Sequence, residues 1–131
     1  MGRSPARSFR DLDVYRLARA LSQKVFQLMT QFPREEKFSL TDQMRRSARA
    51  VNAMIAEAWA RRRYEAAFIN KLNEALGESM ETQAWLDHAI DCGYLTNEQH
   101  TELDSEWQHV GAMLSRMIDL SASFCQTKPT N

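Results

Sequence analysis

Apolar residues recur every three or four positions along most of the chain, which is the spacing of one face of an α-helix. Four stretches carry this pattern, over about residues 11–32, 39–60, 64–91 and 96–124. No stretch shows the two-residue alternation of a half-buried strand. The pattern therefore predicts four amphipathic helices. In the last of them, the apolar face comprises Leu103, Trp107, Val110, Leu114 and Met117.

Residues that stop or start helices separate these stretches. Pro33 is expected to end the first helix, because the residue before a proline avoids the helical region. The run Arg61–Arg63 follows the last apolar turn of the second helix, and Gly93 fits a left-handed cap after the third. Two capping boxes are expected to start the second and fourth helices: Ser39 with Asp42, and Thr96 with Gln99.

Short connections between long helices imply antiparallel neighbours. The sequence therefore predicts an all-α fold, an antiparallel up-down-up-down four-helix bundle over residues 11–125. A flexible N-terminal arm (1–10) and a disordered polar tail (126–131) are expected on either side. The 131 residues leave room for one such domain.

The composition excludes several classes of protein. Four glycines and three prolines are too few for the glycine-rich loops that bind phosphates or dinucleotides. The N-terminus has no apolar segment typical of a secretory signal, and no run reaches the roughly 18 apolar residues of a membrane span. We therefore expect a cytoplasmic protein whose two cysteines, Cys92 and Cys125, are reduced.

The charges are distributed unevenly along a chain whose net charge is zero. Residues 1–63 carry 14 Lys and Arg against 6 Asp and Glu, whereas residues 64–131 carry 3 against 11. This asymmetry has three interpretations. Basic and acidic helices pair within one bundle, they form contacts between subunits, or the basic half binds nucleic acid.

The basic residues of the second helix are the candidate nucleic-acid site. Several guanidinium groups on one surface can bind phosphates in bidentate fashion. The alternative is a solvated face with ion pairs four residues apart, Asp42 with Arg46 and Glu57 with Arg61. We expect Glu57 and Arg61 to form a structural ion pair in either case. The candidate site comprises Arg45, Arg46, Arg49, Arg61, Arg62 and Arg63.

No set of residues predicts catalysis or metal binding. Glu106 and His109 form a single Glu-x-x-His motif, whereas di-iron bundles need two such motifs and two further glutamates. His88 and Cys92 lie four residues apart, but two ligands do not make a site. We therefore expect no enzyme activity, no cofactor, no metal and no small-molecule substrate.

Some apolar residues lie off or at the edges of the main helical faces. Wider apolar faces indicate a second buried surface, and Trp and Met are frequent at interface centres. The alternative is that these residues widen the core of the bundle itself. The candidate oligomer interface comprises Met54, Trp59, Tyr64, Trp85 and Met113.

Several short segments, in this order and spacing, carry a family resemblance. They are Phe9–Tyr15, Phe32–Leu40, Gln43–Ala48, Ile55–Glu57, Phe68–Leu72 and Gly93–Leu95. Over about residues 9–124 the chain resembles the four-helix-bundle proteins encoded by intervening sequences of bacterial 23S ribosomal RNA genes. That family is also similar to the accessory variability determinants of diversity-generating retroelements.

The resemblance implies a ring-like homopentamer with no established catalytic activity and a role in binding nucleic acid or protein. The retroelement relatives are strongly basic, whereas this chain is neutral. Two functions therefore remain open at the level of sequence. One is an oligomeric bundle that binds RNA or DNA through its basic helix face, and the other is a scaffold for protein–protein interaction.

Overall fold

The computed structural model describes residues 5–125, and all regular structure in that part of the chain is helical. The predicted all-α class is therefore confirmed. In chain order the elements are η1 (Phe9–Asp11), α1 (Asp13–Met29), η2 (Arg34–Glu36), η3 (Lys37–Thr41), α2 (Asp42–Ala60), α3 (Glu65–Asp91), α4 (Asn97–Asp119) and α5 (Ser121–Phe124). The predicted tail, 126–131, and residues 1–4 of the predicted arm lie outside the described residues.

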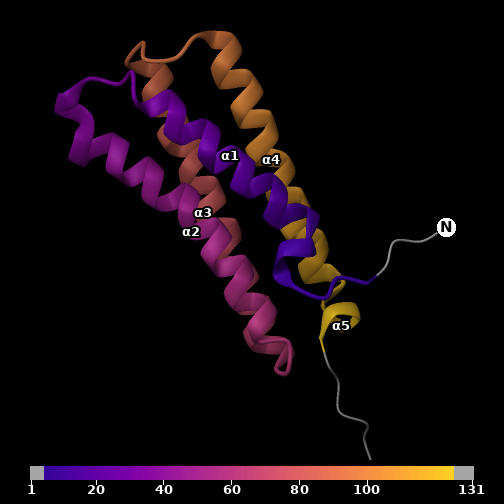
Figure 1. Cartoon of the computed structure of the whole chain (residues 1–131). Coiled ribbons are helices and arrows are strands. Elements are labelled where there is room, and N and C mark those ends of the chain that lie inside the picture. The colour runs from indigo at the N-terminus through magenta and orange to yellow at the C-terminus, as the bar shows by residue number, and fades with distance from the viewer. Residues whose placement is uncertain (1–4, 126–131) are drawn as a thin grey trace, which may run out of the picture.

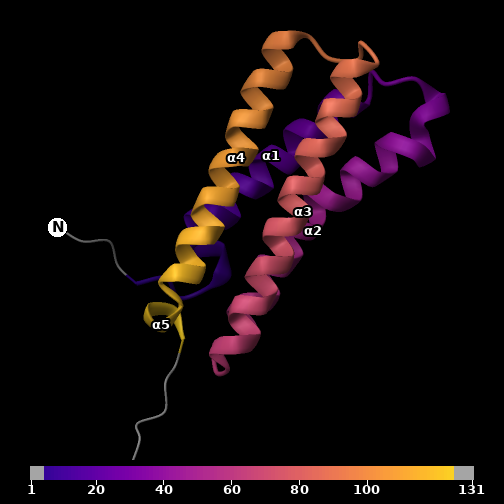
Figure 2. The ribbon, with the colours of Figure 1, turned by 180° about the vertical axis from the view of Figure 1, so that it is seen from behind.

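The four long helices pack side by side as a helical bundle (Figures 1 and 2). Helix α2 packs against α1 and α3, and α4 packs against α3 and α1. The α1–α2 and α3–α4 connections lie at one end of the bundle (Figure 1). The α2–α3 turn and α5 lie at the other end. None of the described helices is both long and apolar enough to cross a membrane.

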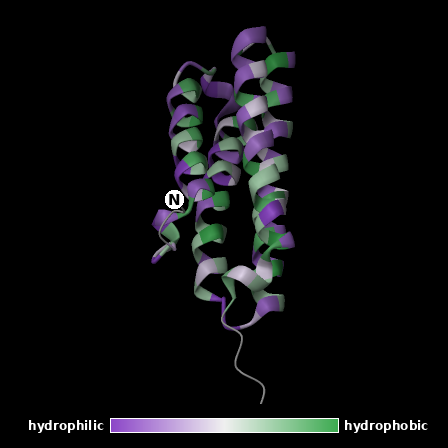
Figure 3. Cartoon of the chain, turned by 90° about the vertical axis from the view of Figure 1, so that its right-hand side faces the viewer, coloured by the Kyte–Doolittle hydropathy of each residue, from purple (hydrophilic) through white to green (hydrophobic). Residues whose placement is uncertain are grey.

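The core of the bundle is made by the apolar faces that the sequence predicts. On α4, Trp107, Val110 and Leu114 are fully buried, and on α3 so is Phe68. Each helix also carries hydrophilic positions away from the core (Figure 3). Thr82 is a polar residue of α3 that is buried in this core without having been predicted there.

One of the two predicted capping boxes is present, at the start of α4. Thr96 Oγ1 accepts a hydrogen bond from the Gln99 N–H at 3.1 Å, and Gln99 Oε1 accepts one from the Thr96 N–H at 2.9 Å. Gly93 has a φ of 76°, so the predicted left-handed cap is also confirmed. The box at Ser39 is wrong. Residues Lys37–Thr41 form a π-helical turn that runs directly into α2, so no extended residue is available to cap it.

The segment before α1 is held by its own short-range hydrogen bonds. The backbone N–H groups of Arg7 and Ser8 donate to Asp11 Oδ2 at 2.9 and 3.1 Å, and they lower the pKa of Asp11. The ring of Phe9 meets Tyr15 edge-on, with centroids 5.0 Å apart. Residues 7–10 of the predicted arm are therefore placed against the start of α1.

Helix α5 is a single turn that covers the first turns of α3. The chain leaves α4 at Leu120, and Ser121 Oγ then donates to Glu65 Oε2 at 2.8 Å. The rings of Phe68 and Phe124 stack with centroids 5.9 Å apart. Cys125 follows as a free thiol whose pKa is raised by burial.

A tyrosine joins the two connections at the other end of the bundle. Tyr94, after α3, donates its hydroxyl to Glu36 Oε2 at 2.8 Å. Its ring lies 5.4 Å from that of Phe32, which follows α1. The hydrogen bond to the Glu36 carboxylate raises the pKa of Tyr94 to about 12, because ionising the phenol would place two negative charges side by side.

We predict that Glu36→Gln lowers the pKa of Tyr94 towards the value of about 10 for free tyrosine. A raised pKa stabilises the fold below pH 10, and that contribution is lost as the pH rises through about 12. The measurement is an alkaline absorbance titration, with Tyr94→Phe subtracted to isolate this phenol. An unchanged midpoint in the Glu36 variant would contradict the assignment.

Candidate nucleic-acid interface

The six arginines predicted to bind nucleic acid fall into two groups in the structure. Arg45, Arg46 and Arg49 lie along the first half of α2. Arg61, Arg62 and Arg63 make the turn between α2 and α3, at the end of the bundle opposite Tyr94 (Figure 1). The two groups differ in the partners of their guanidinium groups.

Arg46 is bound to two carboxylates of the neighbouring helix. Its Nη1 lies 3.2 Å from Glu78 Oε2, and its Nη2 contacts Glu81. The hydrogen bond that Arg46 donates to Glu78 raises the pKa of Arg46, and Glu81 adds to this effect. The Asp42–Arg46 pair expected from sequence is absent, because the acidic residues of α3 face this side chain across the helix interface.

Arg45 is also neutralised within the chain. Its Nη2 lies 2.6 Å from Asp42 Oδ1, one turn earlier on α2. A guanidinium that already binds a carboxylate must give up that partner before it can bind a phosphate. Arg45 and Arg46 are therefore the weakest members of the predicted site, because Arg45 pairs within α2 and Arg46 pairs with the acidic helix α3.

The α2–α3 turn presents three arginines that have no carboxylate partner in the described part of the chain. Helix α2 ends at Ala60, and Arg61 leaves the helical conformation with φ −101° and ψ 15°. The guanidinium of Arg62 lies 3.5 Å from the ring centroid of Trp59, and its Nε donates to the Trp59 carbonyl oxygen at 2.9 Å. Within residues 5–125, none of Arg61, Arg62 and Arg63 makes an ion pair.

The predicted ion pair between Glu57 and Arg61 is wrong. Glu57 Oε2 instead lies 2.9 Å from Nζ of Lys71, on α3, and Glu74 lies 2.8 Å from the same nitrogen. The hydrogen bonds of Lys71 to these two carboxylates raise its pKa, and the bond to Glu74 has the larger effect. Because α2 ends before Arg61, the four-residue spacing no longer brings the two side chains together. Glu57 is exposed.

Four of the five predicted interface residues pack against the core of their own chain. These are Met54, Trp59, Trp85 and Met113, all partly buried. They therefore contribute to the core of their own chain, and their part in an interface between subunits stays a prediction. Tyr64 is different, because 69% of its surface is exposed. The other large exposed apolar side chains of the described residues are Phe26, Phe38, Met80 and Leu120.

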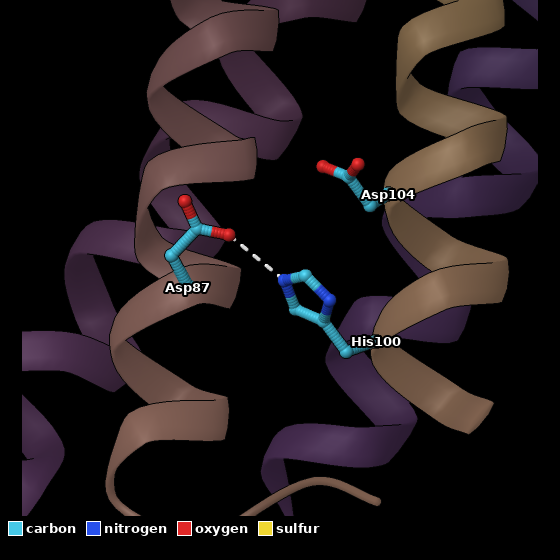
Figure 4. A group of neighbouring side chains, drawn as sticks. All are labelled: Asp87, His100 and Asp104. Atoms are coloured by element: carbon cyan, nitrogen blue, oxygen red, sulfur yellow. Dashed lines mark hydrogen bonds and ion pairs between the residues drawn. The ribbon is translucent and has the colours of Figure 1, made fainter. Parts of the chain in front are cut away.

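One group of side chains has ligand types suited to a divalent metal. Asp87 on α3 faces His100 and Asp104 on α4, with one potential ligand atom from each within 4.8 Å of the others (Figure 4). His100 Nε2 lies 2.8 Å from Asp87 Oδ1, and Asp104 Oδ1 accepts a hydrogen bond from Gln83 at 3.1 Å. These hydrogen bonds join α3 to α4, so the cluster is accounted for as a cross-link between helices.

That cluster differs from the motifs weighed in the sequence. His88, Cys92 and His109 take no part in it. Asp87 and His100 are 13 residues apart and meet only because α3 and α4 lie side by side. No local spacing rule could have paired them.

Comparison with known proteins identifies a family and a similar solved structure. A family model described as 23S rRNA-intervening sequence protein matches residues 10–116. The structure is similar to the crystal structure of a protein of unknown function from the S23 ribosomal protein family of Bacteroides thetaiotaomicron. The two are 31% identical with a TM-score of 0.73, over 81% of this chain and 95% of the other. No curated protein matches the chain.

Proposed function

Because the chain belongs to the 23S rRNA-intervening sequence protein family, we propose that it is a non-enzymatic, oligomeric helical bundle that binds nucleic acid. The proposed contact is the basic turn between α2 and α3. The proposal includes an antiparallel up-down-up-down topology of the four long helices. Connections at alternating ends of the bundle support this topology (Figure 1). The proposal places the protein in the cytoplasm and assigns it no cofactor, metal or small-molecule substrate.

The observation that carries this proposal is the contrast between Arg45 and Arg46 on α2 and the three arginines of the turn. Arg45 and Arg46 are bound to carboxylates, whereas Arg61, Arg62 and Arg63 make no ion pair within the described residues. Three adjacent cations repel one another, and a phosphate backbone relieves that repulsion. Since phosphate contacts carry no sequence information directly, we expect binding that tolerates many sequences.

Aromatic side chains beside the turn support the same function. Trp59 holds the Arg62 guanidinium against its ring, which orders that side chain before binding. Tyr64 follows Arg63 directly and is 69% exposed. An exposed aromatic ring next to cationic groups is a platform on which an unpaired base can stack. Single-stranded or looped RNA is therefore the form of nucleic acid that suits this turn best.

Oligomerisation is the second part of the proposal. The family resemblance implies a homopentamer, and a ring would repeat the basic turn once per subunit. Large exposed apolar side chains are available for subunit contacts, among them Phe38, which is 74% exposed, and Met80, which is 59% exposed. Weak contacts of one turn with phosphates would then add up over the ring.

We predict that Arg61→Gln, Arg62→Gln and Arg63→Gln together weaken RNA binding about tenfold at physiological salt, because three phosphate contacts are lost. The slope of log K against log salt should fall by about 2–3. The measurement is fluorescence anisotropy with a structured RNA and a DNA duplex at low and physiological salt. Unchanged affinity for both would contradict the proposal.

The matched control is Arg45→Gln with Arg46→Gln. These substitutions also remove positive charge from α2, but from guanidinium groups that are already paired. We expect this control to retain RNA affinity and to lose some stability. Equal losses of affinity in both variants would point to net charge rather than to the turn.

The alternative function is a scaffold for protein–protein interaction without nucleic-acid binding. The two functions predict different effects of the three turn substitutions on the oligomeric state. If the basic turn serves subunit contacts, the three substitutions dissociate the oligomer. Native mass measured on the anisotropy sample separates the two functions, because the nucleic-acid proposal requires an intact oligomer that has lost RNA affinity.

A further inference from the structure

A small polar hollow lies between α1 and α2, on a part of the surface that the proposed function does not use. Its volume is about 230 Å³. Every side chain that lines it carries a polar group, and none of them is acidic. The lining residues are Tyr15, Arg19, Ser22, Gln23, Arg49 and Asn52.

Two arginines from different helices converge on this hollow without a carboxylate to neutralise them. Arg19 projects from α1 and Arg49 from α2, and neither makes an ion pair within residues 5–125. Their neighbours differ: Arg16 lies 3.7 Å from Asp11, and Arg45 lies 2.6 Å from Asp42. Two unpaired cations lining one hollow repel each other, and a bound anion turns that repulsion into attraction.

The other lining residues supply neutral donors and a fixed frame. Asn52 Nδ2 donates to the Tyr15 carbonyl oxygen at 3.1 Å, which ties α2 to α1 beside the hollow. The guanidinium of Arg49 lies 5.6 Å from the ring centroid of Phe26, a contact that orients it. The side chains of Ser22 and Gln23 make no hydrogen bond to other described residues, so both can donate to a ligand.

We propose that this hollow is a phosphate-binding subsite. Guanidinium groups bind phosphate oxygens in bidentate fashion, and hydroxyl and amide groups complete the donor set. The hollow is smaller than the roughly 300–1,000 Å³ of pockets for whole small molecules. It therefore suits one phosphate group with its waters, rather than a nucleotide or a cofactor.

The inference rests on the proposed function for the source of that phosphate, which would be a backbone phosphate of bound nucleic acid. Arg49 lies twelve residues before Arg61, or about 18 Å along a helix axis. The hollow and the basic turn are thus separate contacts, and each can be removed without the other. Free inorganic phosphate has the same recognition chemistry and is the competing source.

The test uses amide NMR spectra of the intact wild-type protein in a phosphate-free buffer, titrated first with inorganic phosphate. We expect shifts confined to the amides of Ser22, Gln23, Asn52 and their neighbours. The variant Arg19→Gln with Arg49→Gln should weaken this binding about tenfold, because both bidentate partners are gone. The control, Arg34→Gln with Lys37→Gln, removes two charges from the α1–α2 connection and should bind as wild type.

A second titration with structured RNA distinguishes the sources. Shifts of the same amides by RNA, reduced in the Arg19 and Arg49 variant, assign the subsite to a backbone phosphate. Shifts by inorganic phosphate alone assign it to the free ion and retain the site. The proposal is overturned if neither ligand shifts these amides, or if the variant responds as wild type does.

The two proposals fail in different ways. Substituting Arg61, Arg62 and Arg63 leaves the hollow intact, so inorganic phosphate should still shift its amides in that variant. If the turn proves irrelevant to RNA but the hollow binds phosphate, the proposed function loses its site and the subsite stands. If the turn binds RNA and neither ligand shifts the amides of the hollow, only the subsite proposal is overturned.

Discussion

Replacing Trp107 by alanine is expected to lower the free energy of unfolding by about 3–5 kcal/mol. Trp107 is fully buried on α4 and is the largest buried side chain of the core. Its removal leaves a cavity that the surrounding side chains of the core can close only in part. A domain of this size is stable by only about 5–15 kcal/mol, so the variant should be marginally folded.

Trp107→Phe is the matched control for this experiment. The indole Nε1 of Trp107 has no hydrogen-bond partner among the described residues, so phenylalanine removes a buried polar group that is unsatisfied. We expect a loss of about 1 kcal/mol or less, since the ring volume is largely retained. Urea unfolding followed by circular dichroism measures both variants. A loss well above 1 kcal/mol in Trp107→Phe would mean that the indole nitrogen has a partner, such as a buried water.

Thr82→Val is expected to cost about 1–3 kcal/mol, although it keeps the shape of the side chain. Thr82 Oγ1 on α3 lies 2.8 Å from Ser47 Oγ on α2, and both residues are buried. Valine leaves the Ser47 hydroxyl with the Met44 carbonyl oxygen as its one polar contact, at 3.1 Å. The pair is a buried polar contact between α2 and α3.

A double-mutant cycle isolates the contribution of that hydrogen bond. The single variants Ser47→Ala and Thr82→Val each leave the other hydroxyl with only a carbonyl oxygen of its own helix, whereas the double variant removes both hydroxyls. We therefore expect the double variant to lose less than the sum of the two single losses. Additive losses, measured by the same urea unfolding, would show that the two hydroxyls do not interact.

Helices and core could be predicted from sequence because they depend on local spacing. The apolar face of α4, from Leu103 to Met117, is buried as its three- and four-residue spacing predicts. Thr96 and Gln99 form their capping box because both partners lie within one turn. The box at Ser39 failed because helical turns preceding α2 removed the extended residue that a cap requires.

The charged contacts could not be predicted in the same way, because their partners lie on neighbouring helices. Arg46 has Asp42 four residues before it, yet it binds Glu78 and Glu81 on α3. Glu57 likewise binds Lys71 on α3. Spacing rules rank partners along one helix, whereas the packing of α2 against α3 decides which charges meet. The same packing separates the paired arginines from those of the turn.

The subsite between α1 and α2 shows the same limit. Arg49 was a candidate because it lies on the basic face of the second helix. Arg19 was not, because nothing in the sequence indicates that α1 brings it to the same hollow. Of the predicted residues, the proposed contacts therefore retain Arg49 and the three arginines of the turn. Arg19 of α1 is added to the contact that contains Arg49.

The covering of α3 by α5 has a consequence for the order of folding. The hydrogen bond from Ser121 to Glu65 joins residues 56 positions apart, and the stacked rings of Phe68 and Phe124 are equally distant in sequence. Closing a loop of this length costs more chain entropy than closing the short loop between α3 and α4. Contacts between α3 and α4 should therefore form first near Thr96. Helix α5 should pack against α3 in the last stage of folding.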